Sequence, residues 1–321
     1  ESAVEERNAH HHDAHGCVLI GSTCGPRPII QLADNTPGFD DASVPEATVT
    51  NGVVVERPTV KPVIHFWRQQ EVERGASSDP ELEDGSRNYN QVIRNIDIDL
   101  GFGNEGAVGI RHNGAEGSGI HEVQVDARDG FAGIYNFPAS GGTPINVEVV
   151  GGRYGIFAPR GRGGANIIVG LRLSGQRDQP IVYTHQYPLV IVGFEIEHDR
   201  GPVIDRRNYY HDCSGHLALI DGSIDLSNGD SESAVQNTDR SIYMKNVYLR
   251  GVSTIVANSF EGSTLSVQSE ESWTRVDEYV YVDGAGFIDS MVNGVTTRQT
   301  IQATELSVEG PSSDLVERHV Y

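Results

Sequence analysis

Between Val92 and Arg250 the chain repeats a short pattern in which one polar residue separates two large apolar residues. The pattern occurs seven times, as Ile96-Asp97-Ile98, Val123-Gln124-Val125, Val147-Glu148-Val149, Leu171-Arg172-Leu173, Phe194-Glu195-Ile196, Ile224-Asp225-Leu226 and, with a tyrosine in the middle, Val247-Tyr248-Leu249. The first residues of successive triplets are 27, 24, 24, 23, 30 and 23 positions apart. Alternation with a period of two is typical of β-strands. Each triplet therefore predicts a short strand that buries its two apolar residues.

A second series of apolar phrases lies between these triplets and has nearly the same period. It comprises Gly109-Ile110-Arg111, Gly133-Ile134-Tyr135, Gly155-Ile156-Phe157, Ile181-Val182-Tyr183 and Val203-Ile204-Asp205. Two interleaved series with one common period indicate a solenoid in which every turn contributes two or three strands. We therefore expect an all-β chain, folded as a right-handed parallel β-helix with about 23–27 residues per turn.

The chain divides into a polar N-terminal segment, residues 1–15, and a β-helix over residues 16–321. The segment contains several histidines, which we interpret as part of a solvated loop and not as a metal site. Polar, turn-rich insertions are expected within the β-helix at about 40–60, 71–90 and 229–240. No cap is evident at either end. Because bare ends would expose unpaired strand edges, we expect further copies of the chain or missing segments to cover them.

Charge excludes some classes of function. The 321 residues include 45 acidic and 24 basic side chains, which gives a net charge of −21. Such a surface is unsuited to nucleic acid, because contacts to phosphate require clustered basic side chains. The sequence also lacks an apolar run of about 18 residues, so we expect no membrane-spanning helix.

Stacking the turns predicts which residues form continuous rows, since equivalent residues of neighbouring turns lie about 4.8 Å apart. The first and third residues of the triplets form two apolar rows, which we assign to the core. The residues that precede the triplets are Asn95, Glu122, Asn146, Gly170, Gly193, Ser223 and Asn246. Asn and Gly tolerate the left-handed backbone conformation. This row therefore predicts a structural corner.

The outward residues of the second series form a row with three aromatic side chains, namely Arg111, Tyr135, Phe157, Tyr183 and Asp205. Exposed aromatic rings can stack on the apolar faces of sugar rings, and a contiguous apolar strip on a surface calls for explanation. We interpret the row as a substrate-binding strip. The alternative is that a loop such as 71–90 covers the strip, which would then be a second small core.

Several segments resemble the early turns of a known superfamily. They are Gly16-Cys17-Val18-Leu19-Ile20-Gly21, Arg27-Pro28-Ile29-Ile30-Gln31-Leu32-Ala33, Pro37-Gly38-Phe39, Lys61-Pro62-Val63-Ile64-His65-Phe66, Gly106-Ala107-Val108-Gly109-Ile110 and Gly130-Phe131-Ala132-Gly133-Ile134. The chain resembles the pectate-lyase superfamily of β-helices, in particular the glycoside-hydrolase-28-related and family-55-like glucanase group. The acidic segment and capping helix with which such proteins usually begin have no counterpart here. The resemblance implies a carbohydrate-active protein that is secreted or at the cell surface.

The densest cluster of titratable residues follows the end of the aromatic strip. Its candidate catalytic residues are Asp205, Arg206, Tyr209, His211 and Asp212, and candidate substrate-binding residues one and two turns earlier are His185, Arg160 and Arg162. A hydrolase needs two carboxyl groups, for which Asp205 and Asp212 are candidates, with Asp178, Glu195 and Glu197 nearby in the stacked turns. A lyase would use arginine to neutralise a uronate carboxylate and a tyrosine, histidine or arginine to remove the adjacent proton.

We therefore expect a polysaccharide as partner and a hydrolase as the function, with a lyase as one alternative. The second alternative is a structural β-helix of a surface layer, filament or tail fibre, which stacks end to end. No pattern specifies a cofactor, and Ca²⁺ stays open as a bound ion. Cys17 and Cys24 are close enough in sequence to form a disulfide, and the spacing leaves that pairing open.

Overall fold

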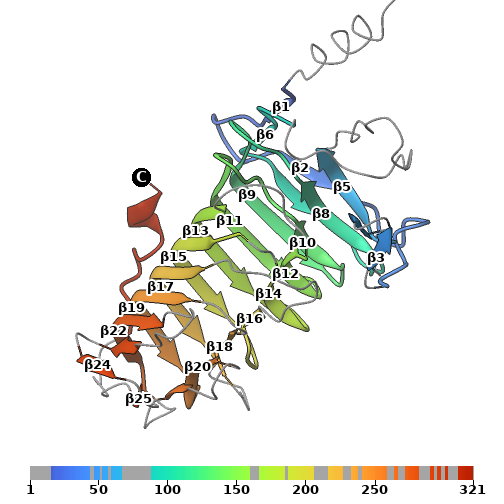
Figure 1. Ribbon diagram of the computed structural model, residues 1–321. Coiled ribbons are helices and arrows are strands. Elements are labelled where there is room, and N and C mark those ends of the chain that lie inside the picture. The colour runs from blue at the N-terminus through green and yellow to red at the C-terminus, as the bar shows by residue number, and fades with distance from the viewer. Residues whose placement is uncertain are drawn as a thin grey trace, which may run out of the picture.

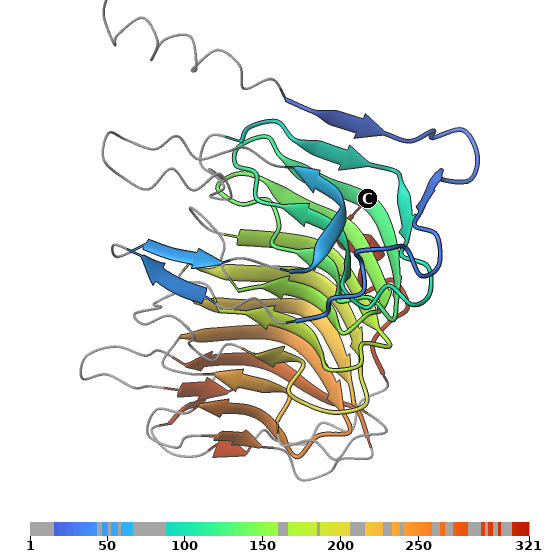
Figure 2. The ribbon, with the colours of Figure 1, turned by 90° about the vertical axis from the view of Figure 1, so that its right-hand side faces the viewer.

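The protein is a parallel β-solenoid of about six turns, which is the β-helix that the repeat predicts (Figure 1). The computed structural model describes residues 16–43, 47–50, 53–56, 59–66, 88–159, 166–184, 187–205, 216–226, 233–237, 241–258, 264–266, 272–281, 290–292, 295–297, 301–302 and 310–320. Successive turns stack along one axis, from the blue N-terminal end to the orange C-terminal end (Figures 1 and 2). In these residues no helix has the length and apolar character needed to cross a bilayer.

One face of the solenoid is a sheet of 13 strands, here called the long sheet. Its strands are β1 (Val18–Ile20), β2 (Ile29–Gln31), β6 (Val92–Arg94), β7 (Asp97–Asp99), β9 (Gly119–Arg128), β11 (Thr143–Gly151), β13 (Asn166–Ser174), β15 (Leu189–Glu197), β17 (Leu217–Asp225), β19 (Ile242–Arg250), β22 (Thr274–Tyr281), β23 (Ser290–Val292) and β24 (Val295–Thr297). Neighbours are parallel up to β19, after which β22, β23 and β24 pair antiparallel.

The opposite face is a sheet of ten strands, here called the short sheet. Its strands are β5 (Lys61–Phe66), β8 (Ala107–His112), β10 (Ala132–Tyr135), β12 (Tyr154–Ala158), β14 (Gln179–Tyr183), β16 (Ile204–Asp205), β18 (Val235–Asn237), β20 (Thr254–Asn258), β21 (Thr264–Ser266) and β25 (Ile301–Gln302). A separate antiparallel hairpin is formed by β3 (Ala47–Thr50) and β4 (Val53–Glu56), and η2 (Glu317–His319) is a short 3-10 helix.

Two of the predicted insertions contain regular structure. The interval 40–60 includes the β3–β4 hairpin, and the interval 229–240 includes β18, whose Val235 belongs to the core. The prediction of a plain loop at 229–240 is wrong at residues 235–237. This strand buries one valine and one asparagine, so it shows almost no apolar alternation in the sequence. Of the interval 71–90, only residues 88–90 are among those described.

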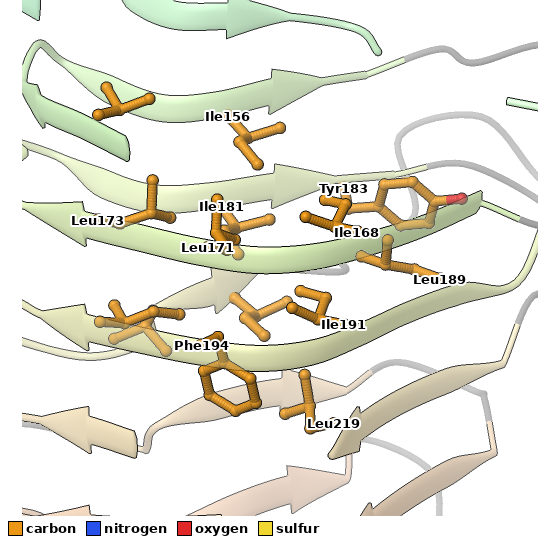
Figure 3. Close-up of a cluster of buried hydrophobic side chains, with 14 of the residues drawn as sticks. Ile156, Ile168, Leu171, Leu173, Ile181, Tyr183, Leu189, Ile191, Phe194 and Leu219 are labelled. Atoms are coloured by element: carbon orange, nitrogen blue, oxygen red, sulfur yellow. The ribbon is translucent and has the colours of Figure 1, made fainter. Parts of the chain in front are cut away.

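Apolar side chains from both sheets meet inside the solenoid and form one continuous core (Figure 3). The two predicted inward rows of the long sheet are buried throughout, with one correction in β17. Phe194 pairs with Gly222 and Ile196 pairs with Ile224, so the triplet Ile224-Asp225-Leu226 is displaced by two residues from its predicted place. The prediction misplaced the triplet because the first core position of this turn is occupied by Gly222, which has no large apolar side chain.

Gly222 leaves room for the ring of the residue one turn before it. A Cβ atom at position 222 would lie 2.1–2.2 Å from three ring atoms of Phe194. No real Cβ tolerates such contacts, so the large and the small residue fill one shared volume. This pairing fixes the register between β15 and β17.

The complementarity between Phe194 and Gly222 can be tested by a double-mutant cycle. We expect Gly222→Ala to lower the free energy of unfolding by about 1–3 kcal/mol, because it overpacks the core. In a Phe194→Leu background the same substitution should cost clearly less, because the ring has gone. Urea denaturation of the four proteins measures both effects, and strictly additive costs would contradict the assignment.

The corner that precedes the triplets is left-handed in every turn described. Positive φ angles occur at Asn95, Glu122, Asn146, Gly170, Gly193, Asp221 and Asn246. The predicted row is confirmed except in β17, where the two-residue displacement replaces Ser223 with Asp221. Side chains along the row bond from turn to turn: Asn146 Nδ2 donates to Glu122 Oε2 over 2.5 Å, and Asn246 Nδ2 donates to Asp221 Oδ1 over 2.7 Å.

Asn146 is the clearest test of this corner. We expect Asn146→Ala to destabilise the fold by about 1–2 kcal/mol, because alanine tolerates the left-handed backbone poorly. Asn146→Gly should cost less, since glycine adopts that backbone freely and loses only the bond to Glu122. Chemical denaturation compares the two variants. Equal costs would show that the side-chain bond, and not the backbone conformation, selects asparagine here.

Candidate functional site

The predicted polar cluster falls almost entirely outside the part of the chain that the structure describes. Arg160, Arg162, His185, Arg206, Tyr209, His211 and Asp212 lie outside the described residues, and only the backbone of Asp205 is described. The strands before these segments stack in register, with Ile156 beside Ile181 and Ile181 beside Ile204. The strands after them also stack, with Asn166 beside Leu189. The catalytic and binding roles of these residues stay predictions.

The alignment that placed Tyr183 in the aromatic row is wrong by one residue. Tyr183 pairs with Ala158, whereas Val182 pairs with Phe157. A shift of one residue turns a side chain to the opposite face of the sheet. Tyr183 accordingly lies inside the main core (Figure 3), where its hydroxyl accepts a bond from Asn166 Nδ2 (2.6 Å) and donates to the carbonyl of Tyr187 (2.9 Å).

Arg111, Tyr135 and Phe157 do form an outward row, as predicted. Tyr135 is fully buried and Phe157 is 5% exposed. They belong to a second apolar cluster on the outer face of the short sheet, made of Val60, Val108, Phe131, Ala132, Tyr135, Tyr154, Phe157 and Val182. The ring centroids of Tyr135 and Phe157 are 5.4 Å apart, and the Arg111 guanidinium lies 5.0 Å from the centre of the Tyr135 ring. This geometry fits a second small core, the alternative that the sequence left open.

The two interpretations of Tyr135 differ in what its loss does. We expect Tyr135→Ala to lower the free energy of unfolding by about 3–5 kcal/mol, as for other large-to-small changes in a core. An exposed sugar platform would instead lose affinity at unchanged stability. Thermal and urea denaturation decide between them, with Ile167→Ala on the exposed outer face of β13 as the matched control. A Tyr135→Ala protein as stable as this control would instead support the interpretation of the row as a substrate-binding strip.

A second group of candidate residues lies on the outer face of the long sheet. Here Glu148, Arg172, Glu195, Ser223 and Tyr248 follow one another on successive strands. Arg172 Nε lies 3.1 Å from Glu195 Oε2, and Arg172 Nη2 also contacts Glu317 Oε1 from the C-terminal segment. One guanidinium therefore holds two carboxyl groups, one from the solenoid and one from residues near the C-terminus.

The C-terminal segment, residues 310–320, packs against the left-handed corner of β13, β15 and β17. Its Leu315 and Val316 are buried. The two corner glycines make room for it: a Cβ at Gly170 would lie 2.5 Å from Val320 Cγ2, and one at Gly193 would lie 2.9 Å from the His319 ring. On the next turn His319 Nε2 lies 2.9 Å from Asp221 Oδ2. The segment, in red at the edge of the long sheet in Figure 1, is thereby fixed beside Arg172 and Glu195.

Glu195 is electrostatically distinct. Among the described carboxyl groups whose pKa is shifted, that of Glu195 is raised, whereas those of Asp41, Asp99 and Asp314 are lowered. Burial raises the Glu195 pKa most, the nearby carboxylates of Glu317 and Glu197 add to it, and Arg172 opposes both. The side chain still exposes about one third of its surface. Glu195 is thus a carboxyl group that holds its proton more tightly than usual and that solvent or a ligand can reach.

The sequence placed Glu195 in an outward row but contained nothing to select it. Glu195 is distinguished by Glu317, which pairs with the same arginine. The repeat could not predict this pairing, because Glu317 is 145 residues from Arg172 and lies in a segment outside the repeat. The sequence shows only that Glu195 is a polar residue at an outward repeat position, a property that most outward positions share.

In the ranges that the structure covers, no three His, Cys, Asp or Glu side chains lie together as the ligands of a metal ion would. Bound Ca²⁺ stays a prediction. Cys17 and Cys24 are both free and exposed, so they do not form the disulfide that their spacing left open.

Comparison with known proteins adds no further assignment. No protein-family model matches the chain, and no curated protein matches it either. The likeness to the pectate-lyase superfamily therefore rests on the sequence segments alone and stays a prediction.

Proposed function

We propose that the protein is a secreted or cell-surface carbohydrate-active β-helix that binds a polysaccharide and hydrolyses it. The observation that carries the proposal is the pair Glu195 and Glu317, which share Arg172, together with the raised pKa of Glu195. Glycoside hydrolysis requires two carboxyl groups in different protonation states on either side of the bond to be cleaved. The sequence resemblance and the fold support the same class.

In the proposed reaction Glu195 is the general acid. Its carboxyl proton passes to the glycosidic oxygen, and the bond between that oxygen and the anomeric carbon breaks. Glu317 is the second carboxyl group, which accepts a proton from a water molecule as that water attacks the anomeric carbon. Arg172 fixes both side chains through its ion pairs. Burial raises the pKa of Glu195, which favours its protonated form.

A polymer suits the shape of this face. The outward rows of the long sheet continue over many turns at about 4.8 Å per turn, so side chains that can bond to hydroxyl groups recur along the solenoid axis. Gln124 and Glu148 lie in the same row as Glu195, and both are partly exposed. A chain of sugar rings laid along the axis would meet one such side chain after another.

The proposal predicts that Glu195→Gln lowers the rate of polysaccharide hydrolysis by at least about 100-fold, the usual contribution of a general acid. Glu105→Gln is the control, because Glu105 is exposed in a turn and is not among the groups that shift the pKa of Glu195. The rate of the wild-type protein should also fall as pH rises through the elevated pKa of Glu195, because the acid then loses its proton. Release of reducing ends from neutral glucans and uronate polymers, followed across pH, measures all three.

The products separate the remaining possibilities. Hydrolysis gives reducing ends without ultraviolet absorbance, whereas a lyase gives an absorbing unsaturated product. Elimination products, or equal rates for Glu195→Gln and Glu105→Gln, would overturn the assignment of Glu195 as the acid.

A further inference from the structure

The first turn of the described solenoid exposes its aliphatic side chains. β1 and β2, the dark blue strands at the top of Figure 2, contribute Val18, Leu19, Ile20, Ile29 and Ile30 to the exposed surface. Ile20 and Ile29 are 63% and 65% exposed. Only three other large apolar residues in the described ranges are exposed, and they are scattered: Tyr89, Phe102 and Ile167. A clustered set of this kind marks a surface that another molecule covers.

The backbone of this turn is also open on one side. β1 pairs with β6 and β2 pairs with β7, and neither strand has another partner among the described strands. Their outer N–H and C=O groups therefore form a free strand edge. Proteins usually protect such an edge with charged side chains, proline or a covering segment, because it readily pairs with another strand.

Charge protection is weak here. Residues 16–33 contain a single charged side chain, Arg27, and its guanidinium lies 2.9 Å from Asp97 of the neighbouring turn. The whole chain carries a net charge of −21, so two copies repel each other over most of their surface. The first turn is a stretch where that repulsion is smallest and where apolar surface is available.

We propose that this edge joins two copies of the chain around a two-fold axis. In such a dimer β1 of one copy runs antiparallel to β1 of the other, and each free strand edge pairs with its equivalent. The aliphatic side chains of both copies then leave water together. The interface is self-complementary, because one surface supplies both halves.

Two other occupants fit less well. Residues 1–15 contain Val4 as their one large aliphatic residue, so they lack the alternation that an added strand needs. Head-to-tail stacking would place the edge against the other end of the solenoid. There the strands turn antiparallel from β22 onward, and no described residue beyond Ile167 is an exposed large hydrophobic. Among the described residues, the apolar and nearly uncharged edge has its best match in the same edge of a second copy.

Light scattering coupled to size-exclusion chromatography, over a range of protein concentrations, tests the dimer. We expect a dimer whose dissociation constant rises at least about 100-fold in the double variant Ile20→Lys, Ile29→Lys, because lysines are then buried at the interface. Ile167→Lys is the control and should dimerise like the wild type. Circular dichroism checks that each variant is folded. Because both isoleucines are exposed, we expect the lysines to leave the fold of the single chain unchanged.

Cys17 provides a second measurement, since its free thiol lies beside β1. In a chain that carries Cys24→Ser and Cys213→Ser, a short bis-maleimide should link Cys17 across the axis and give a covalent dimer. The same reagent should give no dimer in the lysine double variant. A wild-type protein that is monomeric at all concentrations and does not cross-link would overturn the proposal. Open-ended filaments, or a dimer indifferent to the lysines, would overturn it equally.

Discussion

The register between successive turns is the constraint on which the rest of the structure depends. One left-handed corner residue per turn, from Asn95 to Asn246, lies at the equivalent position of each turn of the long sheet, within the strands from β9 to β19. Parallel hydrogen bonding copies this alignment from one turn to the next. Because strand side chains alternate between faces, the copied register decides which residues are core and which face outward. A row of functional groups on such a scaffold is a consequence of stacking, with a spacing that the backbone fixes.

The repeat predicted the fold because its two series were apolar at nearly every turn. It failed where one side chain departed from that rule. At Gly222 the core position is filled by the ring of Phe194 from the turn before, so the turn itself looks displaced by two residues. At Tyr183 the aromatic residue was aligned with Phe157 although Ile181 was the true counterpart of Ile156. A one-residue slip changed a proposed sugar platform into part of the interior.

The candidate site was less predictable than the fold for a physical reason. Periodicity identifies positions that share an environment, whereas a site needs one position whose environment differs. For Glu195 the difference is made by the C-terminal segment, which docks on Gly170 and Gly193 and brings Glu317 to Arg172. That docking depends on the lack of a side chain at Gly170 and Gly193, and no sequence pattern within residues 310–320 predicts it.

The most direct test of this account is the pKa of Glu195 itself. Nuclear magnetic resonance of carboxyl-labelled glutamate can follow the Glu195 carboxyl carbon across pH, with Glu195→Gln used to assign the signal. The account predicts a midpoint above 4.5, the ordinary value for a glutamate, and a lower midpoint in Glu317→Gln, where the neighbouring negative charge is gone. A midpoint at or below 4.5 would contradict the proposal that Glu195 keeps a proton for catalysis.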